Sequence, residues 1–199
     1  MCGRYQFSCN FQELKQIVRK AQRTNSPDNI LNFPMDRDIS PTDTAPVLIA
    51  RGNQVTAEFQ RWGIPGWRGG LIINARAETV CDKPMFRRSI AAQRCVIPAS
   101  SYYEWDSQRH PYSFHLPAAP LYLAGIYDNV DGVDCFVILT TAPNSSVQDI
   151  HDRMPLLLTR EQVRPWLTDA QEALNLLTQV PPLLEHGPVD GQLGLADYL

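Results

Sequence analysis

The sequence lacks the features that mark several large classes of protein. It contains no C-x-x-C pair, and its cysteines are odd in number and scattered, at Cys2, Cys9, Cys81, Cys95 and Cys135. This pattern argues against a disulfide framework and a zinc cluster, so we expect no metal and no cofactor. No apolar run approaches the roughly 18 residues that a membrane-spanning helix needs. The first residues also lack the basic stretch and apolar segment of a signal peptide. These absences predict a cytoplasmic protein without a membrane partner.

The chain also lacks the signatures of dinucleotide-binding and repeat folds, and it carries no global positive charge. It has no G-x-G-x-x-G motif, no regular alternation of strands and helices, and no internal repeat. The formal net charge is −3, which by itself indicates no nucleic-acid partner. Arginines nevertheless crowd the middle third of the chain, at Arg61, Arg68, Arg76, Arg87, Arg88 and Arg94. A locally basic groove on an acidic protein is compatible with this distribution, although charge alone does not establish it.

Apolar periodicity predicts many short strands with helices mainly near the ends of the chain. Helices are expected over 11–22, behind Asn10, over 84–92, over 160–167, capped by Thr159, and from the cap Asp169 through Leu177. Strands are expected at 47–51, 55–62, 71–73, 94–97, 101–105, 112–116, 121–127, 135–141 and 155–158. Residues 144–150 predict one or two helical turns. Residues 23–46, 62–67 and the tail from Val180 are expected to be irregular.

These elements define the expected fold class. With 199 residues, 44% of them hydrophobic, the chain has apolar material for one core, and we expect one domain over residues 1–199. The prediction is an α+β fold around a curved, mostly antiparallel β-sheet or a partly closed barrel, with peripheral helices.

Cys2 has the most distinctive chemistry in the chain. If Met1 is removed, Cys2 carries an α-amine and a thiol on adjacent carbons. In unstructured peptides the pKa is about 7.7–8.0 for such an amine and about 8.5 for the thiol, so a useful fraction of each is reactive near neutrality. The amine can condense with an aldehyde to an imine, on which the thiol closes to a thiazolidine. Alternatively, the thiolate can attack an amide carbonyl with the amine as its base. A cysteine with no special role is equally compatible with this position.

Three further polar side chains are candidates for proton transfer and orientation. Asn74 follows a short apolar strand, Glu104 lies among aromatic residues in 102–105, and His151 lies in the polar stretch 150–155. Burial among aromatic rings would raise the pKa of Glu104 and suit it to act as a general acid. Each also has a structural interpretation: Glu104 can point to water, His151 can be a packing residue, and Asn74 can form a turn. Arg76 can pair with Glu78. As a set with Cys2, the three supply what aldehyde capture needs.

The chain resembles the SRAP family of SOS-response-associated peptidases, the abasic-site shielding proteins, over residues 1 to about 158. The motifs that carry the resemblance are Met1-Cys2-Gly3-Arg4-Tyr5, Ser40-Pro41, Trp62-Gly63-Ile64-Pro65-Gly66-Trp67, Asn74-Ala75-Arg76-Ala77-Glu78-Thr79, Arg94-Cys95-Val96-Ile97-Pro98, Tyr103-Glu104-Trp105, Ala124-Gly125-Ile126-Tyr127, Thr140-Thr141-Ala142 and Ile150-His151-Asp152-Arg153-Met154-Pro155. Residues 159–199 carry no such motif. So many motifs in one order make the resemblance highly specific.

The resemblance implies a DNA-repair function that spacing alone does not show. It implies a monomer that binds abasic sites in single-stranded DNA and forms a thiazolidine through Cys2, with removal of Met1 and a possible lyase activity. Four residues match the family's catalytic positions: Cys2, Asn74, Glu104 and His151. Five match its DNA contacts: Arg4, Arg76 and Arg153 for phosphates, and Trp67 with Pro41 for the flanking bases. Trp62 is expected to be a packing residue.

The sequence departs from the family pattern in two places, and two other functions remain open. Asp38 replaces the usual Asn before Ile39-Ser40-Pro41 and would repel phosphate unless Arg37 neutralises it. Residues 99–101 replace the usual Ala-Asp-Gly, which we interpret as a change of turn. One alternative is a class-II glutamine amidotransferase, which also begins Met-Cys-Gly, although the Asn-Gly-Glu motif of that class is absent. The other is a non-covalent single-stranded DNA-binding module with an inert Cys2.

Overall fold

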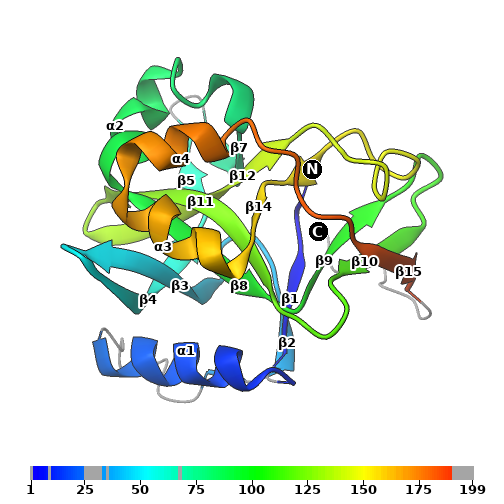
Figure 1. The fold of residues 1–199 in the computed structure, drawn as a ribbon, viewed down its shortest axis with the longest axis horizontal. Coiled ribbons are helices and arrows are strands. Elements are labelled where there is room, and N and C mark those ends of the chain that lie inside the picture. The colour runs from blue at the N-terminus through cyan, green and yellow to red at the C-terminus, as the bar shows by residue number, and fades with distance from the viewer. Residues whose placement is uncertain (1, 9, 25–32, 35, 67–68, 190–199) are drawn as a thin grey trace.

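The computed structural model describes residues 2–8, 10–24, 33–34, 36–66 and 69–189 of the chain (Figure 1). Within these ranges the helices are α1 (Gln12–Thr24), α2 (Pro84–Ala92), α3 (Arg160–Thr168) and α4 (Ala170–Leu176), with a 3-10 turn, η1 (Ala77–Thr79). They lie at the periphery of the strands, with α1 on one side and α2, α3 and α4 on another (Figure 1). None of the described helices is long and apolar enough to cross a membrane.

The centre of the fold is a closed barrel of five strands. These are β3 (Thr44–Arg51), β4 (Gln54–Trp62), β8 (Arg94–Ala99), β11 (Leu121–Val130) and β12 (Val133–Thr141). They follow the order β12-β4-β3-β8-β11, and the pairing of β11 with β12 closes the ring. Every neighbouring pair is antiparallel except β4 and β12, which run parallel at the register of Cys135 with Arg61. Three short strands extend the barrel: β7 (Asn74–Arg76), β13 (Met154–Pro155) and β14 (Leu157–Leu158).

A second antiparallel sheet carries the start of the chain. Its order is β15 (Glu185–Pro188), β10 (Pro111–His115), β9 (Ser101–Trp105), β1 (Tyr5–Ser8) and β2 (Asp36–Ile39). β1 therefore lies between β2 and β9, with Tyr5 opposite both Ile39 and Tyr102. A separate hairpin joins β5 (Ile64–Pro65) to β6 (Leu71–Ile72).

The helices form where the sequence supplies an apolar face and a cap. Helix α1 buries Leu14, Ile17, Val18 and Ala21, one row of an amphipathic pattern. The Asp169 side chain accepts hydrogen bonds from the backbone N–H groups of Gln171 and Glu172 at the start of α4. Trp166 of α3 is fully buried and donates from Nε1 to the Cys95 carbonyl at 2.9 Å, which holds this helix against β8.

The expected α+β class, the antiparallel sheet with a barrel and the four peripheral helices are confirmed. The prediction of irregular structure was wrong in three places: β2 and the start of β3 lie within 23–46, β5 within 62–67, and β15 within the tail. Two of these segments are polar strands whose partners lie far along the chain, since β2 pairs with β1 and β15 with β10, whereas β5 is only two residues long and pairs with β6. Residues 144–150 form successive turns without a regular helix. Residues 25–32 and Trp67 lie outside the described residues.

Candidate active site

Cys2 lies three residues before the start of β1, in the interior of the molecule. Its side chain is fully buried, and Sγ lies 3.7 Å from the Arg4 carbonyl oxygen. The position is fixed because β1 is hydrogen-bonded on both edges, for example through the Tyr103 N–H, which donates to the Arg4 carbonyl at 3.0 Å. Burial raises the pKa of the Cys2 thiol well above its ordinary value, and the charge of Glu104 adds to this effect. At neutral pH the sulfur therefore carries its proton.

Asn74 reaches Cys2 from the barrel side. It begins β7, which runs parallel to β12 with Asn74 opposite Ile138. Its Nδ2 donates a hydrogen bond of 2.8 Å to the Cys2 carbonyl oxygen. This bond joins two residues far apart in the sequence and fixes the backbone that carries the thiol. A simple turn-forming role for Asn74 does not account for it.

Glu104 points into the molecule from the middle of β9. Only 2% of the residue is exposed, so the alternative in which it faces water does not hold. Burial raises the pKa of Glu104 to about 7. A carboxyl group with this pKa is present in both protonation states near neutrality, which suits a group that gives and takes a proton in one reaction.

His151 follows the turns after β12 and faces Glu104. Its Nε2 lies 3.5 Å from Glu104 Oε2. Its Nδ1 lies 3.0 Å from the Arg153 backbone nitrogen and 3.2 Å from the Arg153 carbonyl oxygen, so this turn fixes the ring with Nε2 directed toward Glu104. Asp152 Oδ1 also lies 3.1 Å from Nδ1, but the Asp152 side chain is 90% exposed and water screens its charge. Burial lowers the pKa of His151, so the imidazole is neutral at pH 7.

The structure thus brings all four residues expected to be catalytic into one place, from four separate segments. The arrangement is a buried thiol beside a carboxyl and an imidazole that can exchange a proton, with an amide holding the backbone. Such a set can drive attack on a carbonyl carbon with proton transfer to the oxygen or nitrogen that develops. Among the described residues no group of three or more His, Cys, Asp or Glu side chains could hold a metal ion.

Two of the arginines expected to bind phosphate are held by carboxylates. Arg4 is 8% exposed, and its Nη1 lies 3.9 Å from Asp38 Oδ2. Arg153 forms two hydrogen bonds of 2.7 and 2.8 Å with the carboxylate oxygens of Glu78 and a third of 2.7 Å to the Thr140 carbonyl. The hydrogen bonds from Arg153 lower the pKa of Glu78. An alternative interpretation paired Glu78 with Arg76, whereas the hydrogen-bonding partner in the structure is Arg153.

The negative charge of Asp38 is not neutralised by Arg37, the partner considered from the sequence. Arg37 pairs with Asp43 at 2.7 Å instead of with the Asp38 side chain. Asp38 accepts a hydrogen bond of 3.2 Å from the Tyr103 hydroxyl and faces Arg4. The positive charge opposite Asp38 is therefore Arg4, across the β1–β2 pair.

Of the other residues singled out from the sequence, the structure describes Arg76, Pro41 and Trp62. Arg76 is exposed on β7, and Pro41 is half-buried in the turn between β2 and β3. Trp62 is fully buried, stacks on Phe136 and donates from Nε1 to the Ile73 carbonyl at 3.0 Å, so its packing role is confirmed. Trp67 is outside the described residues, and its expected contact with a base stays a prediction.

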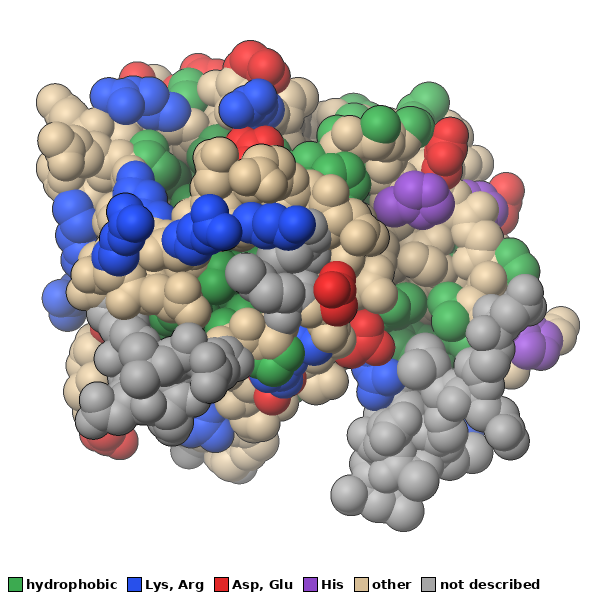
Figure 2. Space-filling model, turned by 90° about the horizontal axis from the view of Figure 1, so that it is seen from below, with side chains coloured by type: hydrophobic (Ala, Val, Ile, Leu, Met, Phe, Trp, Pro, Cys, Tyr) green, Lys and Arg blue, Asp and Glu red, His purple; other side chains and the backbone are tan. Residues whose placement is uncertain are grey.

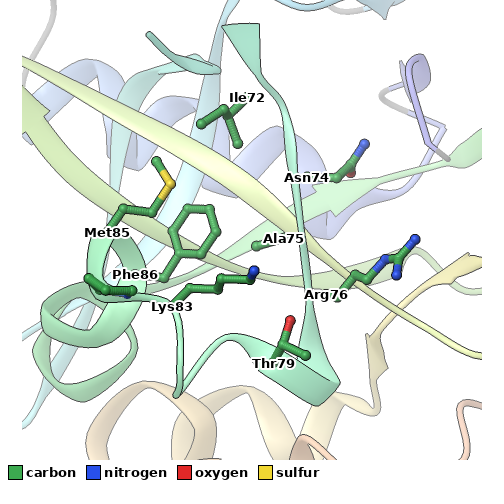
Figure 3. A pocket seen from close by; sticks show the side chains of 9 residues that line it. Ile72, Asn74, Ala75, Arg76, Thr79, Lys83, Met85 and Phe86 are labelled. Carbon is green, nitrogen blue, oxygen red and sulfur yellow. The ribbon is translucent and has the colours of Figure 1, made fainter. Parts of the chain in front are cut away.

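A groove next to Asn74 was not predicted from the sequence. It has a volume of about 830 Å³ and is bordered by β7 and the start of α2 (Figure 3). The residues at its α2 end carry no chemical signature in the sequence, since Lys83, which precedes the helix, and Met85 and Phe86 within it look like an ordinary helix start after a turn. Only the packing of α2 beside β7 reveals them.

Comparisons with known proteins agree with the sequence resemblance. The family model described as SOS response associated peptidase (SRAP) matches residues 1–194. The abasic site processing protein YoaM of Bacillus subtilis is 38% identical over 189 residues, covering 84% of this chain and 79% of YoaM. Abasic site processing protein YedK of Escherichia coli is 27% identical, with 84% and 79% of the two chains covered. The crystal structure of a phage-related protein from Bordetella bronchiseptica superposes with a TM-score of 0.75 at 24% identity, covering 99% and 98% of the two chains, and shows the same fold.

Proposed function

The chain belongs to the SOS response associated peptidase (SRAP) family, and from that premise we propose that it captures abasic sites in single-stranded DNA as a covalent adduct of Cys2. Relatives named abasic site processing proteins support DNA with abasic sites as the substrate. The observation that carries the chemistry is a chain of contacts at Cys2: Asn74 is hydrogen-bonded to the Cys2 carbonyl, the charge of Glu104 acts on the Cys2 thiol, and His151 lies 3.5 Å from Glu104.

The reaction requires a free α-amine on Cys2, so Met1 must first be removed. In the unprocessed chain this nitrogen is part of the Met1–Cys2 peptide bond and cannot attack a carbonyl. The thiol and the Glu104–His151 pair are the groups at hand for hydrolysis of that bond, with Cys2 Sγ as the nucleophile or Glu104 activating a water. We propose self-processing as the peptidase activity of this protein.

In the processed protein the amine of Cys2 attacks the aldehyde carbon of the ring-opened deoxyribose. The carbinolamine loses its hydroxyl as water when a protonated group donates to the departing oxygen, and Glu104 with its pKa of about 7 suits that step. Cys2 Sγ then adds to the carbon of the resulting iminium ion, whose nitrogen keeps its proton, and the thiol proton passes to the Glu104 carboxylate. The product is a thiazolidine, and the balance is protein plus DNA minus one water.

Protonated sulfur is compatible with this order of steps. The thiol has a raised pKa, so it is a poor nucleophile until its proton is taken. After Glu104 has given its proton to the leaving water, it is a carboxylate beside the thiol and can accept the sulfur's proton. Neutral His151, 3.5 Å away, can relay protons between Glu104 and the sugar oxygens. A lyase route follows if the imine loses the 3′ phosphate by β-elimination before the thiol closes.

The proposal is tested by the intact mass of the protein before and after incubation with a single-stranded oligonucleotide that carries one abasic site. We expect loss of Met1, followed by a gain equal to the oligonucleotide minus water. The Cys2→Ala variant should bind the oligonucleotide reversibly and form no adduct that survives heat and SDS. An adduct of equal yield with Cys2→Ala would show that another residue is the nucleophile.

The two other functions make different predictions in the same experiment. A protein that loses Met1, forms no adduct and releases ammonia from glutamine would be an amidotransferase. A protein that binds intact and abasic strands equally, without an adduct, would be a non-covalent binding module.

A further inference from the structure

A second groove lies between helices α1 and α3, and we term it the α1–α3 groove. It consists of two hollows with volumes of about 300 and 330 Å³. Both hollows are lined by Glu13, Tyr122 and Arg160, so one continues into the other. The lining residues include none of those proposed to act in catalysis or expected to contact DNA. Neither role therefore accounts for this groove.

The rim of the first hollow is positively charged. Lys20 of α1 donates a hydrogen bond to the Val55 carbonyl oxygen. Arg164 of α3 donates one of 2.9 Å to the Asn53 carbonyl oxygen. Both side chains are exposed, and within the described part of the chain neither forms an ion pair. An ammonium has three donors and a guanidinium five, so most of these donors remain available to a carboxylate from outside. Because the two cations are already held in place, such a carboxylate binds at a lower entropy cost.

The residues shared by the two hollows balance the one carboxylate of the groove. Glu13 Oε1 lies 3.4 Å from Arg160 Nε. Burial, together with the neighbouring Glu13 carboxylate, raises the pKa of Tyr122, so its hydroxyl keeps its proton. The groove thus has three cations, Lys20, Arg160 and Arg164, against one carboxylate. It therefore favours a negatively charged occupant.

The remaining surface of the groove is mainly aliphatic. The floor of the first hollow includes the buried side chains of Ile17, Leu48 and Val163. Apart from Thr159 and the shared residues, the second hollow is lined by Leu116, Ala118, Ala119, Pro120, Leu158 and Pro182. Among the described residues that line the groove, Tyr122 has the only aromatic ring, and it is 5% exposed. The groove therefore suits aliphatic side chains and lacks an exposed ring on which a nucleic-acid base could stack.

We propose that the α1–α3 groove is a docking site for a short segment of a partner protein in which acidic residues adjoin aliphatic ones. The acidic residues bind Lys20 and Arg164, and the aliphatic side chains enter the second hollow beyond Arg160. The charge of the groove selects an acidic segment, and its aliphatic surface favours a peptide over a nucleic acid. The site goes beyond the proposed function, and a segment bound there occupies none of the expected DNA contacts.

The test measures binding of fluorescein-labelled peptides to the full chain by fluorescence anisotropy. The probes are a peptide of consecutive aspartates followed by leucines and the peptide with the reverse order. At least one of them should bind saturably, whereas the peptide with lysines in place of the aspartates should not bind. Replacing the leucines by serines should weaken binding about tenfold, because the aliphatic side chains then no longer leave water.

Variants of exposed side chains locate the binding in the groove. Lys20→Ala and Arg164→Ala should each weaken binding of the acidic peptide about two- to fivefold, and Arg164→Glu about tenfold. Arg19→Ala is the matched control, because Arg19 is an exposed cation of α1 that lines neither hollow. Its affinity for the peptide should equal that of the native protein. No saturable binding of either acidic peptide, or an equal loss in Arg19→Ala, would overturn the inference.

An intact single-stranded oligonucleotide tests the competing occupant. If it displaces the acidic peptide and its own affinity falls in Lys20→Ala and Arg164→Ala but not in Arg19→Ala, the groove is a nucleic-acid site and the inference is wrong. The result does not depend on the covalent chemistry, since peptide binding is measured without DNA. With abasic DNA, Lys20→Ala and Arg164→Ala should form the adduct at the native rate, and a slower rate would contradict the separation of the two sites.

Discussion

Glu104 illustrates how one side chain can destabilise the fold and still suit the reaction. Its folded pKa of about 7 is above the ordinary value of 4.5, so the folded protein holds a proton that the unfolded chain releases in this range. Stability from this group is fully present below pH 4.5 and is lost as the pH rises through 7. Above that pH the buried carboxylate costs about 3.5 kcal/mol at most, from about 1.4 kcal/mol for each unit of pKa shift.

Glu104→Gln should therefore separate stability from activity. We expect the variant to be more stable than the native protein at pH 8 and similar at pH 4.5, because the amide never ionises. Adduct formation should slow by about 10²–10⁴-fold, the usual contribution of a general acid. Thermal unfolding across this pH range and the rate of crosslinking to abasic DNA check the two parts. A variant that crosslinks at the native rate would leave Glu104 with a structural role only.

At the scale of the elements, the β1–β2 pair places Asp38 opposite Gln6, so that its carboxylate reaches the Arg4 side chain, close to the chain segment that carries Cys2. A carboxylate in this position opposes the approach of phosphate, and it also occupies an arginine that the family resemblance assigns to DNA. The position thus lowers the charge available for binding without removing the arginine.

Asp38→Asn should raise the affinity for single-stranded DNA. Asparagine keeps an oxygen that can accept the hydrogen bond from Tyr103 but removes the negative charge. Two charges about 4 Å apart in water interact by about 1 kcal/mol, so the gain should be roughly fivefold at low salt and smaller at high salt. Binding by fluorescence anisotropy at two salt concentrations measures it. Unchanged affinity would indicate that this strand pair does not approach the DNA.

The Asp169 side chain caps α4 and makes no recorded contact with Cys2, Asn74, Glu104 or His151, so we expect the cap to act on stability alone. Asp169→Ala removes the acceptor for two backbone N–H groups and should cost about 1 kcal/mol. For a chain of this size that corresponds to a fall in Tm of roughly 2–4 °C. Asp169→Asn, which retains a cap, should lose much less. Crosslinking by folded Asp169→Ala should proceed at the native rate, and a slower rate would show coupling between this helix and the site.

At the scale of the whole molecule, the charge distribution favours attraction of DNA to one part of the surface over attraction to the molecule as a whole. Lysines and arginines number 18 against 21 acidic residues, and basic side chains also lie on a face that includes α1 (Figure 2). The groove beside Asn74 contributes two cations free of ion pairs among the described residues, Arg76 and Lys83. Net charge therefore supplies no general attraction, and contacts at the groove decide the salt dependence.

The salt dependence of binding should accordingly be shallow. For single strands each phosphate contact contributes about −0.7 to the slope of log K against log salt, so two contacts predict a slope of roughly −1.4. A titration of Cys2→Ala protein with abasic DNA between low and moderate salt measures the slope. A slope steeper than about −4 would mean that Arg4, Arg153 and further cations also release their partners to bind phosphate.

The sequence allowed much of the site to be predicted, for reasons specific to each residue. Cys2 carries its chemistry in its position, and Glu104 is marked by the aromatic residues around it. The pairings Arg153–Glu78 and Arg4–Asp38 were not predicted, because residues far apart in the sequence become neighbours only through the sheet register. The strands β2 and β15 were also not predicted, because their partners are distant in the sequence. Their polar residues form strands because β1 and β10 offer unpaired edges. The groove was missed because it exists only between two packed elements.

The place of β1 between β2 and β9 has a consequence for the order of synthesis. Cys2 leaves the ribosome before any other residue of the site, yet its strand gains both neighbours only after residue 105 has been made. His151 follows later still, after β12 has closed the barrel. A nascent chain therefore carries its reactive residue without proton-transfer partners until most of the protein exists. Cys2 and the groups proposed to move protons for it are therefore brought together only in the finished fold.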